Sequence, residues 1–139
     1  MTKDVAIRFR FRPREAAALN RYARRRQAYP AQVGAQLVCE GLRRAEYAGI
    51  DFRDTPAGRL AFLTGHRLAV WQVAQVVREC GGDPRKAART LALPPLLVAA
   101  AMNYANDFAD EINPLLADAD AISHETLKRL LPGLEVVDG

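Results

Sequence analysis

Apolar and polar residues alternate over residues 5–12. The apolar positions are Val5, Ile7, Phe9 and Phe11, and the positions between them are Ala6, Arg8, Arg10 and Arg12. Successive side chains of a strand point to opposite faces, so the pattern predicts a short β-strand with an apolar face and an arginine face.

Helical patterns follow this strand. Pro13 suits the first turn of a helix over about residues 13–27, with Ala16, Leu19 and Ala23 on one stripe. Pro30 separates this helix from a second one over about 30–47, because the residue before a proline avoids the helical region. One strand and two helices cannot bury Ile7, Phe9 and Phe11 within one chain, so we expect a second copy to complete this core.

The remaining chain predicts a small helical domain and a tail. Residues 50–58 are interpreted as a boundary, and Arg59–Leu63 with His66–Val70 as a short hairpin around Thr64 and Gly65. Periodicity and the Asp83-Pro84 and Pro94-Pro95 signals predict helices over about 69–80, 84–91 and 95–107. The last stretch, 107–139, is predicted to be weakly amphipathic helix with two proline breaks.

The predicted fold is therefore mainly α with a short N-terminal β-strand. We expect three parts: residues 1–49 as a dimerisation unit, residues 50–112 as a helix-turn-helix-like domain, and residues 113–139 as a tail.

Composition places the chain among globular proteins, with half of its residues apolar and 26% charged. The N-terminus lacks the apolar stretch of a signal peptide, and no apolar run approaches the ~20 residues that span a bilayer. Cys39 and Cys80 lie among apolar residues, which favours buried thiols in a reducing compartment. We expect a cytoplasmic protein without disulfides.

Charge is distributed unevenly along the sequence. Residues 1–49 carry eleven lysines and arginines against four acids, a net charge of +7, whereas residues 50–139 carry nine against twelve, a net charge of −3. A basic segment attracts phosphate backbones because neutralised phosphates release counterions. A solvated basic surface remains the alternative, and for Arg24, Arg25 and Arg26 so does favourable placement at the negative end of a helix.

The strand at 5–12, Pro13 and the two following helices resemble the ribbon-helix-helix family of bacterial DNA-binding proteins. The resemblance implies that two chains pair their strands into an antiparallel ribbon, with Ile7, Phe9 and Phe11 in the dimer core. The other face of the ribbon would enter the major groove of DNA. An edge hairpin with a solvated arginine face is the alternative interpretation.

On that DNA-facing side, Arg8 and Arg10 can each form a forked pair of hydrogen bonds with guanine, and Ala6 can contact a thymine methyl group. Arg12 lies nearer the strand end and is expected to reach a phosphate. The family also binds a phosphate at the N-terminus of its second helix, here near Ala31 and Gln32. The chain departs from the family at this turn, where Gln27-Ala28-Tyr29-Pro30 replaces the usual glycine and hydroxyl residue.

The second part is similar to the homeodomain-like domain of VapB-type antitoxins, a family long described as of unknown function. The residues that carry this resemblance are Gly65-His66-Arg67-Leu68, the stretch Gly81–Ala92 and the stretch Ala100–Ile112. Asn103 stands where a second tyrosine is expected. The resemblance implies a PIN-like ribonuclease toxin as partner.

The helix over 95–107 has no lysine or arginine, so it fits a core or a protein interface better than a DNA groove. The tail offers apolar anchors and two cations as a toxin-binding segment: Ile112, Leu115, Leu116, Leu127, Lys128, Arg129, Leu130 and Leu131. The alternative is that these leucines pack on the chain's own second domain.

Catalytic chemistry is not indicated. Five acids, Asp107, Asp110, Glu111, Asp118 and Asp120, could form a metal site, but such acids commonly serve solubility. His66 and His124 lack neighbours in a catalytic spacing, and we expect no cofactor. The sequence predicts a homodimeric antitoxin and transcriptional repressor of a type II toxin–antitoxin pair. A stand-alone ribbon-helix-helix regulator with a ligand-sensing or oligomerising C-terminal domain is the alternative, and a metal nuclease is a third hypothesis.

Overall fold

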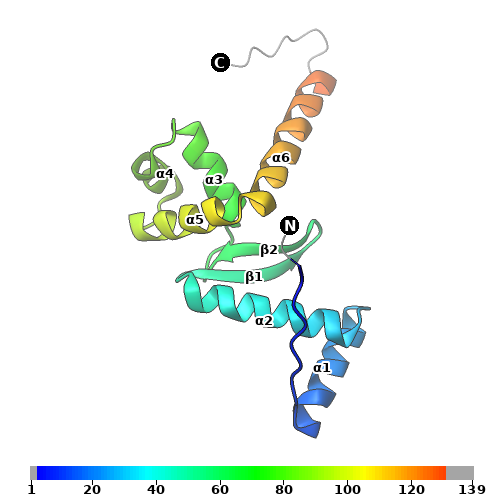
Figure 1. Ribbon diagram of the computed structural model, residues 1–139. Coiled ribbons are helices and arrows are strands. Elements are labelled where there is room, and N and C mark those ends of the chain that lie inside the picture. The colour runs from blue at the N-terminus through cyan, green and yellow to red at the C-terminus, as the bar shows by residue number, and fades with distance from the viewer. Residues whose placement is uncertain (1–2, 131–139) are drawn as a thin grey trace. The chain divides into compact units, whose positions relative to one another are not determined.

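The computed structural model describes residues 3–130, which form six helices and one two-stranded antiparallel sheet (Figure 1). The prediction of a mainly helical protein is confirmed. The chain divides into two compact units at Leu42 and Arg43, seven residues before the boundary expected at residue 49. The shift arises because the last turn of the second predicted helix packs with the second unit.

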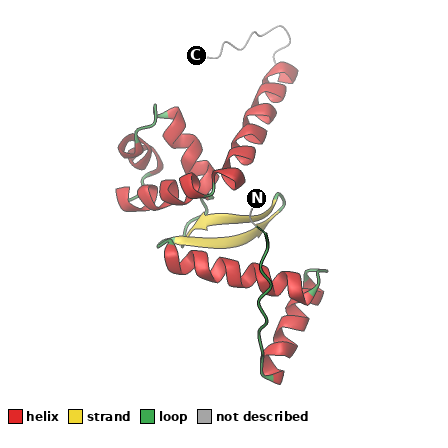
Figure 2. Ribbon diagram, viewed as in Figure 1, coloured by secondary structure: helices red, strands yellow, loops and turns green. Residues whose placement is uncertain are grey.

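The first unit contains an extended segment, helix α1 (Pro13–Arg25) and most of helix α2 (Pro30–Glu46). Pro13 begins α1, and Arg12 before it has the extended backbone that a following proline favours (φ −68°, ψ 156°). Residues 3–12 carry no strand (Figure 2). A strand requires a hydrogen-bonded neighbour, and the described part of a single chain supplies none to this segment.

The second unit opens with a hairpin of β1 (Ile50–Thr55) and β2 (Gly58–Leu63). The interpretation of residues 50–58 as a boundary is therefore wrong. Thr55 pairs with Gly58 across a two-residue turn, and Gly58 has a φ of +106° that a side chain would strain. The hairpin expected around Thr64 and Gly65 is also wrong, since only an isolated bridge between Phe62 and Ala69 forms there.

Four helices complete this unit: α3 (Val70–Glu79), α4 (Pro84–Leu91), α5 (Pro95–Asp107) and α6 (Ala109–Leu130). The first three match the predicted ranges. The Asp83 carboxylate caps α4 by accepting from the backbone N–H groups of Arg85 (2.9 Å) and Lys86 (3.4 Å). The expected break at Pro114 is wrong, because α6 continues through it and through the predicted domain boundary at 112–113.

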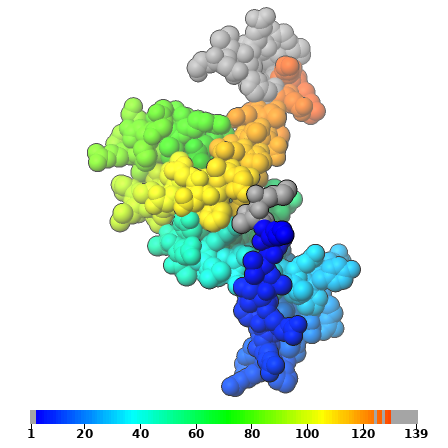
Figure 3. Space-filling view, viewed as in Figure 1, coloured from blue at the N-terminus to red at the C-terminus, as the bar shows by residue number. Residues whose placement is uncertain are grey.

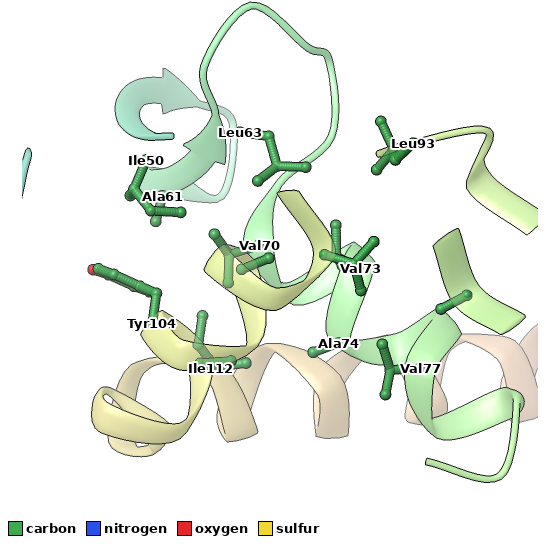
Figure 4. Packing of buried hydrophobic residues seen from close by; sticks show 14 of the residues in the cluster. Ile50, Ala61, Leu63, Val70, Val73, Ala74, Val77, Leu93, Tyr104 and Ile112 are labelled. Carbon is green, nitrogen blue, oxygen red and sulfur yellow. The ribbon is translucent and has the colours of Figure 1, made fainter. Parts of the chain in front are cut away.

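The core of the second unit joins the hairpin to all four helices. Its buried side chains include Leu63 of β2, Val70 and Val73 of α3, and Tyr104 of α5 (Figure 4). The cluster is contiguous, as expected of one hydrophobic core. The second unit thus has a hydrophobic core of its own, whereas the first unit buries few side chains.

Candidate nucleic-acid interface

The apolar face of the N-terminal segment is open to solvent in the single chain. Val5 is 81% exposed, Ile7 72%, Phe9 55% and Phe11 52%. The rings of Phe9 and Phe11 lie 6.4 Å apart between centroids, so they form one continuous apolar patch. Contiguous exposed apolar side chains of this size mark a surface that another molecule covers.

The rest of the first unit has almost no core. Of its described residues, Ala23, Val33 and Glu40 are buried. A groove of about 530 Å³ lies between α1 and α2, and its lining is mostly apolar: Phe11, Glu15, Ala18, Leu19, Arg21, Tyr22, Arg25, Gly34, Leu37 and Val38. The unit therefore presents an unfilled apolar interior that one copy cannot close.

The side chains between these apolar positions are also exposed. Ala6, Arg8, Arg10 and Arg12 are all accessible. Ala31 and Gln32 are exposed in the first turn of α2, where backbone N–H groups lack helical partners. Pro30 has no N–H, so a phosphate at this helix end would depend on Ala31 and Gln32.

The arginine run at the end of α1 is held by local contacts. The Arg26 Nη1 atom donates to the Tyr22 hydroxyl at 3.0 Å, and the guanidinium groups of Arg25 and Arg26 lie over the Tyr22 ring. Arg24 donates to the Asn20 carbonyl at 3.5 Å, at the limit for a hydrogen bond. These contacts agree with placement at the helix C-terminus and leave the outer faces of Arg24 and Arg25 accessible.

The proposed toxin-binding residues do not share one surface. Ile112 is 4% exposed and Leu116 packs partly buried against the core of the second unit, as the alternative interpretation expected for these leucines. Leu115 is half-buried, and Lys128 and Arg129 are exposed on α6. The side chains of Leu127 and Leu130, and all of Leu131, lie outside the described residues.

A polar cluster that the sequence did not predict joins α2 to α5 and α6. The Arg43 Nη1 atom lies 2.8 Å from the Glu111 Oε1 atom and donates to the Tyr104 hydroxyl at 2.9 Å. The Tyr104 hydroxyl donates to the Glu111 Oε2 atom at 3.1 Å. The Tyr47 hydroxyl donates to Asp107 at 2.6 Å.

These contacts shift three pKa values in the cluster. The hydrogen bond that Tyr47 donates to Asp107 raises the pKa of Tyr47. Burial, and then the negative charge of Glu111, raise the pKa of Tyr104 well above its usual range. Burial has the largest single effect and would lower the pKa of Arg43, but the hydrogen bond to Glu111 and the electrostatic effects of Tyr104 and Glu111 together outweigh it and raise the pKa. The cluster therefore holds a neutral Tyr104 beside the ion pair of Arg43 and Glu111.

Two further expectations concern the second unit and the cysteines. Helix α5 buries Val98, Ala101 and Tyr104, which confirms its role in a core. Cys39 is exposed, so the prediction of a buried thiol is wrong for it, and Cys80 is partly buried. Among the side chains that the structure describes, no three acids, histidines or cysteines converge as a metal site. The described helices include none with the length and hydropathy that a membrane crossing requires.

Comparison of the chain with protein-family models, with curated proteins and with solved structures finds no match in any of the three.

Proposed function

We propose that the protein is the antitoxin of a type II toxin–antitoxin pair. In this proposal two chains pair through residues 5–12, the paired strands bind operator DNA, and the second unit holds a PIN-like ribonuclease toxin. The protein itself carries out no catalysis.

One observation supports the dimer most strongly: the first unit has an exposed apolar face at residues 5–11 and almost no core of its own. Phe9 and Phe11 remain about half exposed, and Ile7 more so. Pairing with a second strand would satisfy the backbone groups of this segment and cover these side chains together. The apolar groove between α1 and α2 provides additional surface for a second copy.

The opposite face supports DNA as the ligand. A two-stranded ribbon fits the major groove, and paired strands would present two copies each of Arg8 and Arg10 there. The +7 net charge of residues 1–49 adds attraction for phosphates. Ala6 precedes Arg8 on the same face, and its methyl group can contact a thymine methyl group.

Toxin binding rests on the resemblance of the second part to VapB-type antitoxins. The exposed cations Lys128 and Arg129 are available for contact with an acidic ribonuclease site, and half-buried Leu115 is available for apolar contact. Ile112 is buried in the core of the second unit, so it does not contact a toxin in this proposal.

A stand-alone regulator that senses a ligand is the second candidate. It is favoured by a mostly apolar groove of about 490 Å³ in the second unit, lined by Phe62 of β2, Trp71 of α3 and Leu115 of α6, among others. A groove of this volume fits a small apolar ligand.

The DNA-binding proposal is tested by titrating the DNA upstream of the gene with the full chain and with Arg8→Ala. Losing one forked arginine–guanine pair costs about 1–3 kcal/mol, which weakens binding about 5- to 150-fold. Arg89→Ala removes the same charge from an exposed site on α4 and serves as the matched control. Equal affinity of Arg8→Ala and wild type would reject Arg8 as a base contact.

The antitoxin proposal is tested by co-expression with the reading frame directly downstream, followed by affinity capture. We expect a PIN-like protein to be captured and its growth inhibition to be suppressed. If the downstream product is not captured while the DNA is still bound, the stand-alone regulator is the better account.

A further inference from the structure

Helix α5 presents an exposed face that the packing of the second unit does not use. Ala99 and Ala100 lie three and four positions after Leu96, Asn103 lies three after Ala100, and Asn106 lies three after Asn103, so these residues share one side of the helix. Leu96 is 84% exposed, the highest value among the large apolar side chains of the described residues. Part of α5, yellow in Figure 3, is open on the face shown.

Two hollows flank Leu96 on this face. One, of about 450 Å³, is floored by Ala99, Ala100 and Asn103 and bordered by Glu46 and Asp107. The other, of about 380 Å³, lies toward α4 and includes Arg85. The face thus carries a projecting leucine beside a depression that is floored by small residues of α5 and bordered by residues 46–48 at the end of α2.

We propose that this face pairs with the same face of a second copy, with the two α5 helices antiparallel. A projection and a depression on one surface can fill each other only when a two-fold axis relates two copies of it. The axis would pass near Ala100, the middle of the face, so Leu96 of each copy enters the hollow of the other. Small residues at the crossing allow helix axes to approach to about 8 Å.

Charge supports this antiparallel arrangement. Arg85 lies beside the first turn of α5, in a hollow that it shares with Leu96 and with Asp83, whose carboxylate is engaged in capping α4. At the other end, Asp107 ends the helix and Glu46 lines the other hollow. Antiparallel pairing places the Arg85 end of each copy against the carboxylate end of the other, and parallel pairing would place like charges together. The contact is independent of the N-terminal ribbon, so one chain would carry two self-association surfaces.

The experiment is oxidative cross-linking of the full-length chain with Ala100→Cys, in a Cys39→Ser background. A residue near the two-fold axis lies close to its own copy, so we expect a cross-linked dimer under mild oxidation. The Cys39→Ser chain without Ala100→Cys reports any linkage through Cys80. This readout is local to α5, so it is interpretable whether or not the N-terminal segments pair.

Two sets of variants give the specificity of the pairing. Leu96→Glu should reduce the rate of cross-linking more than about tenfold, whereas Ile122→Glu, a matched change at a 64% exposed isoleucine on α6, should leave it unchanged. Arg85→Glu should slow cross-linking about three- to tenfold. Adding Glu46→Arg to Arg85→Glu restores opposite charges across the contact and should recover the rate.

Circular dichroism and thermal unfolding measure whether each variant folds. Because Leu96 and Arg85 are exposed, we expect their variants to fold like the wild type. The proposal is overturned if Ala100→Cys adds no cross-link, or if Leu96→Glu and Ile122→Glu behave alike. It is also overturned if no cross-link forms and Leu96→Glu instead abolishes capture of the downstream protein, because that protein would then be the occupant of this face.

Discussion

Replacement of Phe9 by alanine should weaken self-association of the full chain without unfolding its second unit. A phenylalanine side chain buries about 200 Å² when fully covered, and Phe9 is 55% exposed in the single chain. About 110 Å² per ring is therefore left for a second copy to cover, worth about 2.5–3 kcal/mol at ~25 cal/mol per Å². Two rings per dimer, less what alanine still buries, give about 4 kcal/mol.

That free energy corresponds to about a thousandfold increase in the dimer dissociation constant. Sedimentation equilibrium over a concentration series measures it, and circular dichroism checks that the helices remain. Ile122→Ala, which truncates a 64% exposed side chain on α6, is the control and should change the constant little. A dissociation constant for Phe9→Ala within about threefold of wild type would refute burial of Phe9 between copies.

Two other predictions concern the second unit. Tyr104→Phe removes the hydroxyl bonded to Arg43 and Glu111 and should lower the free energy of unfolding by about 1–3 kcal/mol, measured by urea denaturation. Because burial raises the pKa of folded Tyr104, the unfolded chain loses this proton first, near pH 10. The contribution of Tyr104 to stability should therefore be constant below pH 10 and be lost above it, so stability should fall less steeply above pH 10 in Tyr104→Phe. An equal slope in both proteins would contradict the buried hydroxyl. Deleting residues 123–139, which spares the core contact of Leu116 on α6, should retain DNA binding and the thermal transition but lose toxin neutralisation; retained neutralisation would remove Lys128 and Arg129 from the interface.

The helices were predictable because local chemistry marks their ends. Asp83 followed by Pro84 predicts the start of α4, and Pro94 followed by Pro95 predicts the start of α5. Both helices begin where these residues indicate. These signals act within a few residues and do not depend on the rest of the fold.

The hairpin was missed although its signal was present. Ile50 and Phe52 alternate with Asp51 and Arg53, and the buried positions of β1 follow that alternation. The run is short, and Pro56 with Gly58 suggests a linker as readily as a tight turn. The true pairing became evident only from contacts between strands.

Contacts between distant residues account for the misplaced boundary. Arg43 meets Tyr104 sixty-one positions later in the sequence, which ties the end of α2 to the second unit. Local patterns cannot show such a partner. Similarly, the sequence of an amphipathic helix does not show whether its apolar side chains pack on the same chain or on a partner. Ile112 packs into the core of the second unit of its own chain.

We propose that residues 5–11 become a strand by pairing with a second copy, and amide hydrogen exchange of the full chain tests this pairing residue by residue. In a two-stranded ribbon, alternate N–H groups point to the other strand, so we expect alternating slow and fast exchange along this segment. Protection should increase with protein concentration and fall in Phe9→Ala. Uniformly fast exchange from Val5 to Phe11, at concentrations where the chain is dimeric, would contradict the ribbon.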